Sequence, residues 1–296
     1  MARRFWTRTR KRRNASRMRR RVQRKIVNQL SKSVAILKPR LTLRFAAVTN
    51  TGGRAKNEDA YRISMRDARA CFAVSDGVGG ENGGEIASHA IVNTVVTHFE
   101  QQDAVTDAAL LACLNAAKAE VARLQATDAA LKKMSATVAV LLLDCERGEA
   151  QWGHLGDSRI YQFRDQKVCR VTKDHSAVQQ LVEAGYCTAD ELRAHPLRSS
   201  LLGAIGVSDA EAADPVQESS EFASGDAFLL CTDGFWEWIA ENQMEAALQG
   251  ASSVERWLDA LEKMAGESAL SSHAPRDNYT AIAIWIADPE SPSDQA

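Results

Sequence analysis

Two apolar segments of this sequence end in the same way, and together they constrain the folds that the chain can adopt. The stretches 71-CFAVSDGVGG-80 and 227-AFLLCTDGFWEW-238 each run as strand-like apolar residues into Ser or Thr, then Asp, then Gly. Gly77 and Gly234 remove the side chain that would block a tight turn or the close approach of another segment. Either motif alone is most simply an Asp-Gly turn, so the repeat is the informative feature.

The two strand-end carboxylates, Asp76 and Asp233, need a partner if they lie near each other. An ionised acid that follows a buried strand is costly to desolvate when it is unpaired. Two such acids that converge require a cation, and hard oxygen ligands select Mg²⁺ or Mn²⁺. The repeat therefore indicates a divalent-cation site where the two strand ends meet.

The apolar periodicity predicts a mixture of strands and helices without an internal repeat. We predict strands at 43–49, 70–75, 136–144, 150–156, 159–164, 168–172, 227–232 and 279–287, with 164-RDQK-167 as a hairpin turn. We predict helices at about 84–100, 106–125 and 253–266, the last introduced by a capping box at 252-SSVE-255. Strands clustered as hairpins favour an α+β fold with antiparallel sheets over a doubly wound fold.

Basic residues are concentrated at the N-terminus. Residues 1–40 contain 16 Lys or Arg and no acid, which leaves 21 basic against 38 acidic residues in the remainder. The apolar spacing from Val22 to Leu37 is helical, and Pro39 ends it. One interpretation is a surface for anionic lipid, nucleic acid or an acidic partner. The other is either a solvated, disordered extension or residues upstream of the true start codon. We expect a basic extension at 1–40, a folded domain at 41–288 and a short tail at 289–296.

Composition places the chain among soluble proteins. Apolar residues make up 45% and charged residues 25%, as in ordinary globular domains. No uncharged apolar run approaches the length of a membrane span. The stretch 3-RRFWTRTRKRR-13 is similar to a twin-arginine signal but lacks a following apolar region, so we do not expect export. Six cysteines without a C-x-x-C pair favour reduced thiols and a cytoplasmic protein.

Further acids lie at the edges of predicted strands. They occur in 54-RAKNEDA-60, 156-GDSRIY-161 and 276-RDNYTAIAI-284, each next to Arg or Asn. Taken singly, each has a simpler interpretation: a solvated loop pair for Glu58 and Asp59, a surface turn for Asp157, and a helix or turn cap for Asp277. All five acidic motifs in one chain are hard to obtain by chance.

In this order the motifs resemble those of the metal-dependent protein phosphatases, the PP2C-like Ser/Thr phosphatases, in their bacterial form. The resemblance covers about residues 43–287 and rests on 54-RAKNEDA-60, 74-VSDGVGG-80, 135-SATVAV-140, 156-GDSR-159, 172-TKDHSAVQQLVEAG-185, 201-LLGAIG-206, 230-LCTDG-234 and 277-DNYT-280. It implies two stacked antiparallel sheets flanked by helix pairs, with a two-metal site at one end. Each sheet would then deliver one Asp-Gly motif to that site.

The resemblance also implies a metal-ligand set for two Mn²⁺ or Mg²⁺ ions. Asp76 would bridge both ions, the Gly77 carbonyl would bind one of them, and Asp233 and Asp277 would complete the direct protein ligands. Asp157 matches a residue that helps bind a third, weaker ion in bacterial relatives. The implied reaction is hydrolysis by a metal-activated water at a binuclear site.

Other residues are expected around that set. Glu58, Asp59 and Asn278 would lie in a second layer that orients water on the metals. Arg54 occupies the position of the phosphate-binding arginine, where a guanidinium fork suits two phosphoryl oxygens. We expect three residues to be essential for turnover: Arg54, Asp76 and Asp233.

The chain departs from the family pattern at three places. Val78 stands where eukaryotic relatives carry His as a general acid, so metal-bound water would protonate the leaving group. Gly203 replaces the usual Arg, which puts a conformational support in doubt, and Val138 replaces a Thr. We interpret His154 as a packed histidine and His175 as a support for a flap segment at about 173–200. Trp236 and Trp238 are expected to serve as core or lid packing.

The expected function is therefore a protein Ser/Thr phosphatase that opposes a kinase, as a cytoplasmic monomer. The closest resemblance is to small stand-alone phosphatases, including those that accompany type VI secretion. A pseudophosphatase that binds phosphoproteins is a rival interpretation, against which the intact metal ligands speak. A second rival makes binding by the basic extension the primary function.

Overall fold

The computed structural model describes residues 41–78, 83–207, 215–272 and 275–288. The chain divides into a unit from Met1 to Lys38 and a compact unit from Pro39 to Ala296. The basic extension and the tail at 289–296 lie outside the described residues, so the expectations for them stay predictions. All of the predicted site residues belong to the second unit.

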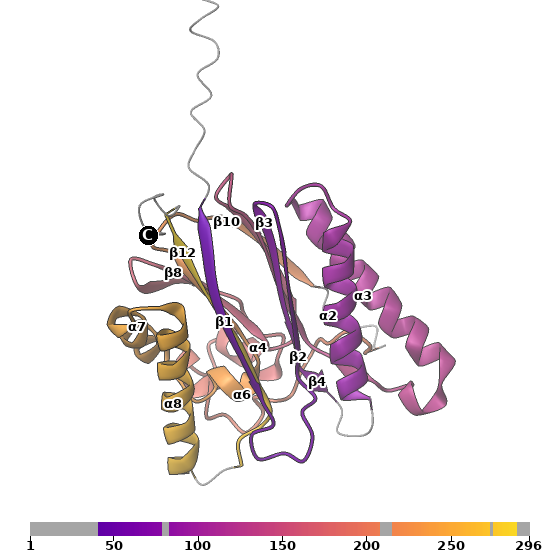
Figure 1. The fold of residues 1–296 in the computed structure, drawn as a ribbon. Coiled ribbons are helices and arrows are strands. Elements are labelled where there is room, and N and C mark those ends of the chain that lie inside the picture. Colours follow the sequence, from indigo (N-terminus) through magenta and orange to yellow (C-terminus); the bar gives the residue numbers. More distant parts are fainter. Residues whose placement is uncertain (1–40, 79–82, 208–214, 273–274, 289–296) are drawn as a thin grey trace, which may run out of the picture. The chain divides into compact units, whose positions relative to one another are not determined.

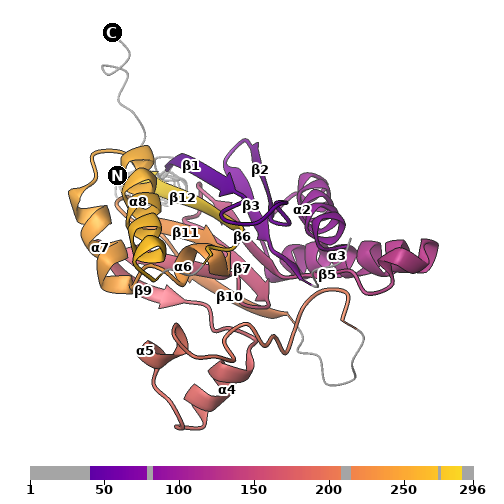
Figure 2. The same cartoon turned by 90° about the horizontal axis from the view of Figure 1, so that it is seen from below.

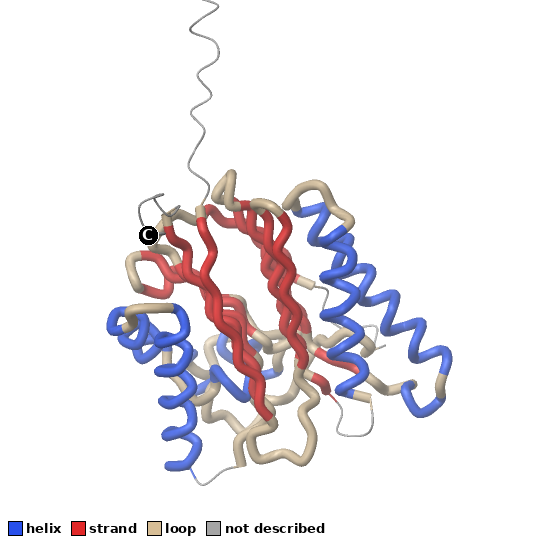
Figure 3. Tube along the Cα trace, viewed as in Figure 1, coloured by secondary structure: helices blue, strands red, loops and turns tan. Residues whose placement is uncertain are grey.

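Two five-stranded antiparallel sheets form the centre of this unit (Figure 3). The strand order of the first sheet is β1-β12-β11-β8-β9. Its strands are β1 (Thr42–Asn50), β8 (Arg159–Arg164), β9 (Lys167–Val171), β11 (Ala227–Cys231) and β12 (Tyr279–Ala287).

The second sheet has the strand order β10-β7-β6-β3-β2. Its strands are β2 (Ala60–Arg66), β3 (Arg69–Ser75), β6 (Val138–Asp144), β7 (Glu149–Leu155) and β10 (Val216–Glu221). Two short strands, β4 (Gly77–Val78) and β5 (Ser135–Ala136), pair beyond the ends of β3 and β6.

Helix pairs cover the outer faces of the two sheets (Figure 1). The pair α2 (Gly84–Glu100) and α3 (Asp107–Thr127) lies on the second sheet, and α7 (Glu241–Gly250) and α8 (Val254–Ser272) lie on the first. Figure 2 shows the fold from below, with α4 (Ala177–Glu183) and α5 (Ala189–Leu192) to one side of the sandwich. Both helices belong to the flap. Short helices α6 (Asp233–Trp236) and η1 (Ala129–Leu131) complete the elements. The predicted α+β sandwich is confirmed.

Residue alternation along the strands divides the core into layers. Successive strand side chains point to opposite faces, so Cys71 and Ala73 of β3 pack against α2 and α3. Phe72 and Val74 point the other way, into the layer between the sheets, where they join Phe228 of β11. Since β3 is covered on both faces, it reads as a continuous apolar run rather than an alternating one.

The predicted helices and strands lie where helices and strands are observed, with three kinds of difference. Helix α8 ends at Ser272 instead of 266, and α4, α5, α6 and α7 were not predicted. The helix cap before α8 is Ser253, whose Oγ accepts from the Arg256 amide, so the predicted capping box is wrong by one residue. The strands β2 and β10 were not predicted, because edge strands such as 216-VQESSE-221 carry mainly polar, exposed side chains.

The cysteine prediction is confirmed: all six are free, and Cys71, Cys113, Cys145 and Cys231 are buried. In the part of the chain that the structure describes, no helix is both long and apolar enough to cross a membrane.

Candidate metal centre

The predicted site residues lie at one end of the sandwich. In Figure 1 this is the lower end, where the β1–β2 loop, β4, α6 and the start of β12 come together. β3 belongs to one sheet and β11 to the other, so each sheet delivers one of the two Asp-Gly motifs, as expected. The antiparallel order brings these strand ends together, because β3 and β11 both run toward this end.

The backbone of Asp76 is fixed by Thr137. The Asp76 amide donates to Thr137 Oγ1 at 3.0 Å, and the Thr137 amide donates to the Asp76 carbonyl at 2.9 Å. Gly77 follows because no side chain fits: an added Cβ would lie 2.5 Å from the carbonyl carbon of Gly84. The first Asp-Gly thus lets the N-terminus of α2 pack against the strand end.

The second motif is equally tight. Asp233 is the first residue of α6, directly after β11. A Cβ on Gly234 would lie 2.1 Å from the backbone oxygen of Asn278, at the start of β12. The glycine therefore permits contact between the segment that carries Asp233 and the segment that carries Asp277.

Asp76 and Asp233 meet across the two sheets. The two side chains are close enough that each shifts the pKa of the other. Burial, followed by repulsion from Asp59, Asp233 and Asp157, raises the pKa of Asp76 well above its usual range. Burial also raises the pKa of Asp233, with a further contribution from Asp277.

Two more buried carboxylates join this cluster. Asp59 accepts a hydrogen bond from Thr232 Oγ1 at 2.8 Å, and burial, with Asp233 and Asp277 nearby, raises its pKa to about 7. Burial, together with the charges of Asp233 and Asp174, raises the pKa of Asp157 well above its usual range. The cluster thus gathers four buried carboxyl groups whose ionised forms repel one another.

The remaining predicted residues hold the β1–β2 loop in place. Asn278 accepts from the Glu58 amide at 2.8 Å and donates to the carbonyls of Thr51 and Lys56 at 2.9 and 2.8 Å. Arg54, on the same loop, donates from Nη2 to Asp277 Oδ2 at 2.7 Å. The loop therefore places a guanidinium beside a predicted metal ligand.

The donor set of this cluster suits a hard divalent cation. Two buried oxygens, Asp59 Oδ1 and Asp233 Oδ1, have no hydrogen-bond partner among the described residues. Oxygen-only ligands of this kind favour Mg²⁺ or Mn²⁺ over softer metals. No three His, Cys, Asp or Glu side chains among the described residues adopt a metal-site geometry, and Asp277 pairs with Arg54. The residues therefore fit the ions in their chemistry, and binding would require their side chains to rearrange.

Several neighbours of the cluster were not predicted. Arg198, on the flap, reaches Asp233 and pairs with Glu237. Arg159 is buried, donates to both oxygens of Asp174 at 2.7 and 2.8 Å, and stacks on Trp236. Trp236 Nε1 in turn donates to the Asp157 carbonyl at 2.9 Å. No spacing or motif in the sequence distinguishes Arg198 from the other exposed-looking arginines.

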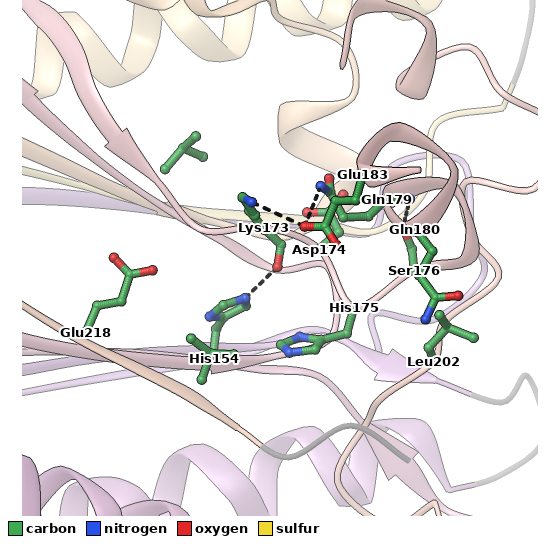
Figure 4. A pocket seen from close by; sticks show the side chains of 12 residues that line it. His154, Lys173, Asp174, His175, Ser176, Gln179, Gln180, Glu183, Leu202 and Glu218 are labelled. Atoms are coloured by element: carbon green, nitrogen blue, oxygen red, sulfur yellow. Dashed lines mark hydrogen bonds and ion pairs between the residues drawn. The ribbon is translucent and has the colours of Figure 1, made fainter. Parts of the chain in front are cut away.

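The flap also covers a separate cavity of about 340 Å³, shown in Figure 4. His154 lies in its wall and donates from Nε2 to the Lys173 carbonyl at 2.7 Å, while its ring faces His175 at 4.8 Å. Burial lowers the pKa of His154 to about 4. His154 is therefore packed, as predicted. Burial also lowers the pKa of His175, whose support of the flap stays a prediction. None of the predicted metal ligands lines this cavity.

Comparison with known proteins agrees with this geometry. Residues 49–273 match the family model described as protein phosphatase 2C. The chain is 32% identical over 254 residues to the Ser/Thr protein phosphatase PstP of Mycobacterium tuberculosis, which covers 84% of this chain and 46% of PstP. It therefore spans about half the length of that curated relative.

Solved structures show the same fold. The catalytic domain of PstP, in complex with two manganese ions, has a TM-score of 0.70 at 29% identity, covering 84% of this chain and all of that one. PppA, described as a key regulatory component of the type VI secretion system in Pseudomonas aeruginosa, has a TM-score of 0.64 at 24% identity, covering 82% of this chain and 97% of that one. The second likeness carries the fold alone.

A sandwich of two antiparallel sheets that joins strand-end aspartates from both sheets defines the class of metal-dependent phosphatases. Within that class, the chain belongs to the protein phosphatase 2C family. The predicted family, its bacterial form and the fold are confirmed, and the predicted activity and manganese cofactor agree with what the named relatives are and bind. The roles of individual residues stay predictions.

Proposed function

We propose that this protein is a metal-dependent protein Ser/Thr phosphatase that hydrolyses phosphoserine and phosphothreonine. The observation that carries the proposal is the meeting of Asp76 and Asp233, one from each sheet, in a buried cluster of carboxylates. Such a cluster is unfavourable by itself and is neutralised by divalent cations. The PstP catalytic domain, which this chain resembles, holds two manganese ions.

The chain's own residues divide the work of binding and positioning. Asp76, the Gly77 carbonyl, Asp233 and Asp277 would hold two Mn²⁺ or Mg²⁺ ions, with Asp157 available to a weaker third. When bound, the ions supply Lewis-acid activation of water and of the phosphoryl group. Asn278 keeps the loop that carries Glu58, Asp59 and Arg54 against the site.

Arg54 would bind the phosphoryl group of the substrate. Its side chain is exposed and ends beside Asp277, so it can exchange that carboxylate for a phosphate without moving its backbone. A guanidinium donates two parallel hydrogen bonds to a phosphate, which a single ammonium does not. Substrates would be phosphorylated proteins that a Ser/Thr kinase produces, in the cytoplasm, where free thiols persist.

A pseudophosphatase that only binds phosphoproteins is the main alternative. Its signature would be the loss of metal ligands, whereas Asp76, Asp233 and Asp277 are all present. A role of residues 1–40 at an anionic surface or an acidic partner is compatible with either function and rests on their 16 basic residues.

The deciding experiment measures phosphate release from a phosphothreonine peptide by the full chain, with Mn²⁺ or with EDTA. We expect turnover that requires Mn²⁺. Substantial activity in EDTA would contradict the two-metal assignment. Absence of turnover at saturating Mn²⁺, with phosphopeptide binding retained, would favour the pseudophosphatase.

A further inference from the structure

Two arginines from separate segments approach the same pair of carboxylates. Arg54, on the β1–β2 loop, contacts Asp277 Oδ2 at 2.7 Å. Arg198, on the flap, has its Nη1 at 3.7 Å from Asp233 Oδ2. Asp233 and Asp277 are neighbours: a Cβ added at Gly234, the residue after Asp233, would lie 3.3 Å from Asp277 Cβ. The two guanidinium groups thus flank one acidic pair.

Glu237 anchors Arg198. Arg198 Nη2 forms a close ion pair with Glu237 Oε2, and the Glu237 side chain is only 5% exposed. The Glu237 amide donates to the Asp233 carbonyl at 3.0 Å, so the anchor and the predicted metal ligand belong to one turn of chain. One edge of the guanidinium is therefore fixed by a buried carboxylate.

The other edge of Arg198 faces the cluster without being bonded to it. Nη1 donates to Ser199 Oγ at 3.1 Å, and its 3.7 Å separation from Asp233 Oδ2 is beyond hydrogen-bond reach. Glu237 thus prevents the arginine from collapsing onto Asp233. This arrangement leaves donor capacity for an anion placed above Asp233.

A fixed positive charge beside a cation ligand is unfavourable for binding the cation alone. The guanidinium competes with the metal for the same carboxylate, and both are positive. The cost is offset when a phosphate dianion shares the site, since it attracts the metal ions and the guanidinium together. A site with arginines on both carboxylates is therefore suited to an anion held over the metals.

We propose that Arg198 is a second phosphate-binding residue, which brackets the substrate phosphoryl group together with Arg54, and that Glu237 is its positioning residue. The inference rests on the proposed phosphatase function. The flap would then take a direct part in substrate binding. Arg198 lies five positions before Gly203, the position at which this chain lacks the arginine that is usual in the family.

A second flap arginine offers a matched control. Arg193 donates to the carbonyls of Trp236 and Ile239 at 3.4 and 3.1 Å and pairs with Glu241 at 2.8 Å. It ties the flap to the same region as Arg198 but contacts neither Asp233 nor Asp277. If Arg198 were only a latch for the flap, the two arginines would be equivalent.

The test compares the full chain with Arg198→Ala, Arg198→Lys and Arg193→Ala. Calorimetry gives the Kd of inorganic phosphate for Mn²⁺-loaded protein and, separately, the Kd of Mn²⁺ without phosphate; KM is measured with a phosphothreonine peptide. We expect Arg198→Ala to raise the phosphate Kd and KM about tenfold or more, as for loss of a charge-assisted hydrogen bond. Lys should restore part of the affinity. The Mn²⁺ Kd should not rise, and Arg193→Ala should leave the phosphate Kd within about twofold.

Three results would overturn the proposal: an unchanged phosphate Kd in Arg198→Ala, an equal loss in Arg193→Ala, or a weakened Mn²⁺ Kd in Arg198→Ala. If Arg198→Ala does not fold, Glu237→Gln provides the same test, because it keeps the arginine and removes its anchor. We then expect a raised phosphate Kd with an unchanged Mn²⁺ Kd. An unchanged phosphate Kd in Glu237→Gln would overturn the proposal. If the wild type binds phosphate but turns over no phosphopeptide, the proposed function fails while a raised phosphate Kd in Arg198→Ala still supports Arg198.

Discussion

The side chain of Asp76, at the end of β3 in one sheet, lies beside that of Asp233, which follows β11 in the other sheet, and each affects the pKa of the other. Two like-charged groups lie together in a buried place only if a proton or a cation is shared between them. The pair therefore links the two sheets at one end of the sandwich. We expect the two residues to function as a single unit.

Removing either member of this pair should have the same consequence as removing both. We expect Asp76→Asn, Asp233→Asn and the double variant each to lose activity by on the order of 10³-fold or more, far from additively, because residues that act as a unit share one loss. Steady-state kinetics with a phosphothreonine peptide and Mn²⁺ titration by calorimetry would check this. Single losses that multiply in the double variant would contradict a shared site.

The metal-free protein should become less stable as pH rises. Burial and the neighbouring acids raise the pKa of Asp59 to about 7, from 3.8. The folded state then binds a proton that the unfolded state has released, so this contribution is complete below about 3.8 and is lost as pH rises through about 7. Thermal melting in EDTA between pH 5 and 8 should show the decline in the His154→Gln variant, which lacks the opposing titration of His154.

Metal should remove that decline. Bound Mn²⁺ stabilises by RT ln(1 + [L]/Kd), or about 2.7 kcal/mol at a hundredfold excess over Kd. The Mn²⁺ form should therefore melt higher than the EDTA form, most of all near pH 8. Mn²⁺ should restore activity after chelation more readily than Ca²⁺, which prefers looser coordination. A melting temperature that does not respond to Mn²⁺ would count against the cluster as a metal site.

Arg54 should matter for substrate and little for stability. Its ion pair with Asp277 joins two partly exposed side chains, so its loss should cost no more than about 1 kcal/mol. Arg54→Ala should raise KM and lower kcat/KM, with the Mn²⁺ Kd close to wild type, and Lys should rescue only part. Wild-type KM in Arg54→Ala would place the residue outside the substrate site.

The two strand-end glycines should be intolerant of a methyl group. In Gly234→Ala the new Cβ would meet the Asn278 backbone oxygen, so backbone must shift at Asp233 and Asp277. We expect destabilisation of roughly 1–3 kcal/mol and loss of activity. Gly266→Ala, in α8, is the matched control: apart from the backbone of its own helix, no described heavy atom lies within 4 Å of its added Cβ. Stability should therefore rise by about 0.5–1 kcal/mol. Chemical denaturation measures both.

Local sequence pattern was enough to locate most of the core. β3 and β11 are recognisable because burial on both faces demands an unbroken apolar run, and α2 because its apolar face recurs with helical period. β10 was not predicted, because an edge strand with exposed polar side chains does not need an unbroken apolar run. Its position is decided by pairing with β7, a tertiary contact that no local pattern encodes.

The residues of the site also fall into two groups: those that the local sequence identifies and those that only tertiary contacts bring into place. Asp76 and Asp233 could be singled out from residue type and position, since a carboxylate at the end of a buried strand needs a partner. The pairing of Arg54 with Asp277, and the approach of Arg198 to Asp233, could not. Both depend on loops whose path is set by contacts such as those of Asn278 with the β1–β2 loop, between residues more than 200 positions apart.

His154 should make the protein acid-sensitive, with a sign opposite to that of Asp59. Burial lowers its folded-state pKa from 6.5 to about 4, and its Nε2 donates to the Lys173 carbonyl. Below pH 6.5 the unfolded state binds a proton at this histidine and the folded state does not. The contribution of neutral His154 to stability is therefore complete above about pH 6.5 and is lost as pH falls to about 4. The difference between these pKa values corresponds to about 3 kcal/mol.

His154→Gln tests this contribution, because glutamine does not titrate and can still donate to Lys173. We expect the variant to lose less stability than wild type between pH 6.5 and 4.5, measured by urea denaturation in EDTA for both proteins. The carboxylate cluster titrates identically in the two, so it cancels in the comparison. Parallel stability curves for wild type and His154→Gln would show that the buried imidazole is protonated without cost, against the cause assigned to its low pKa.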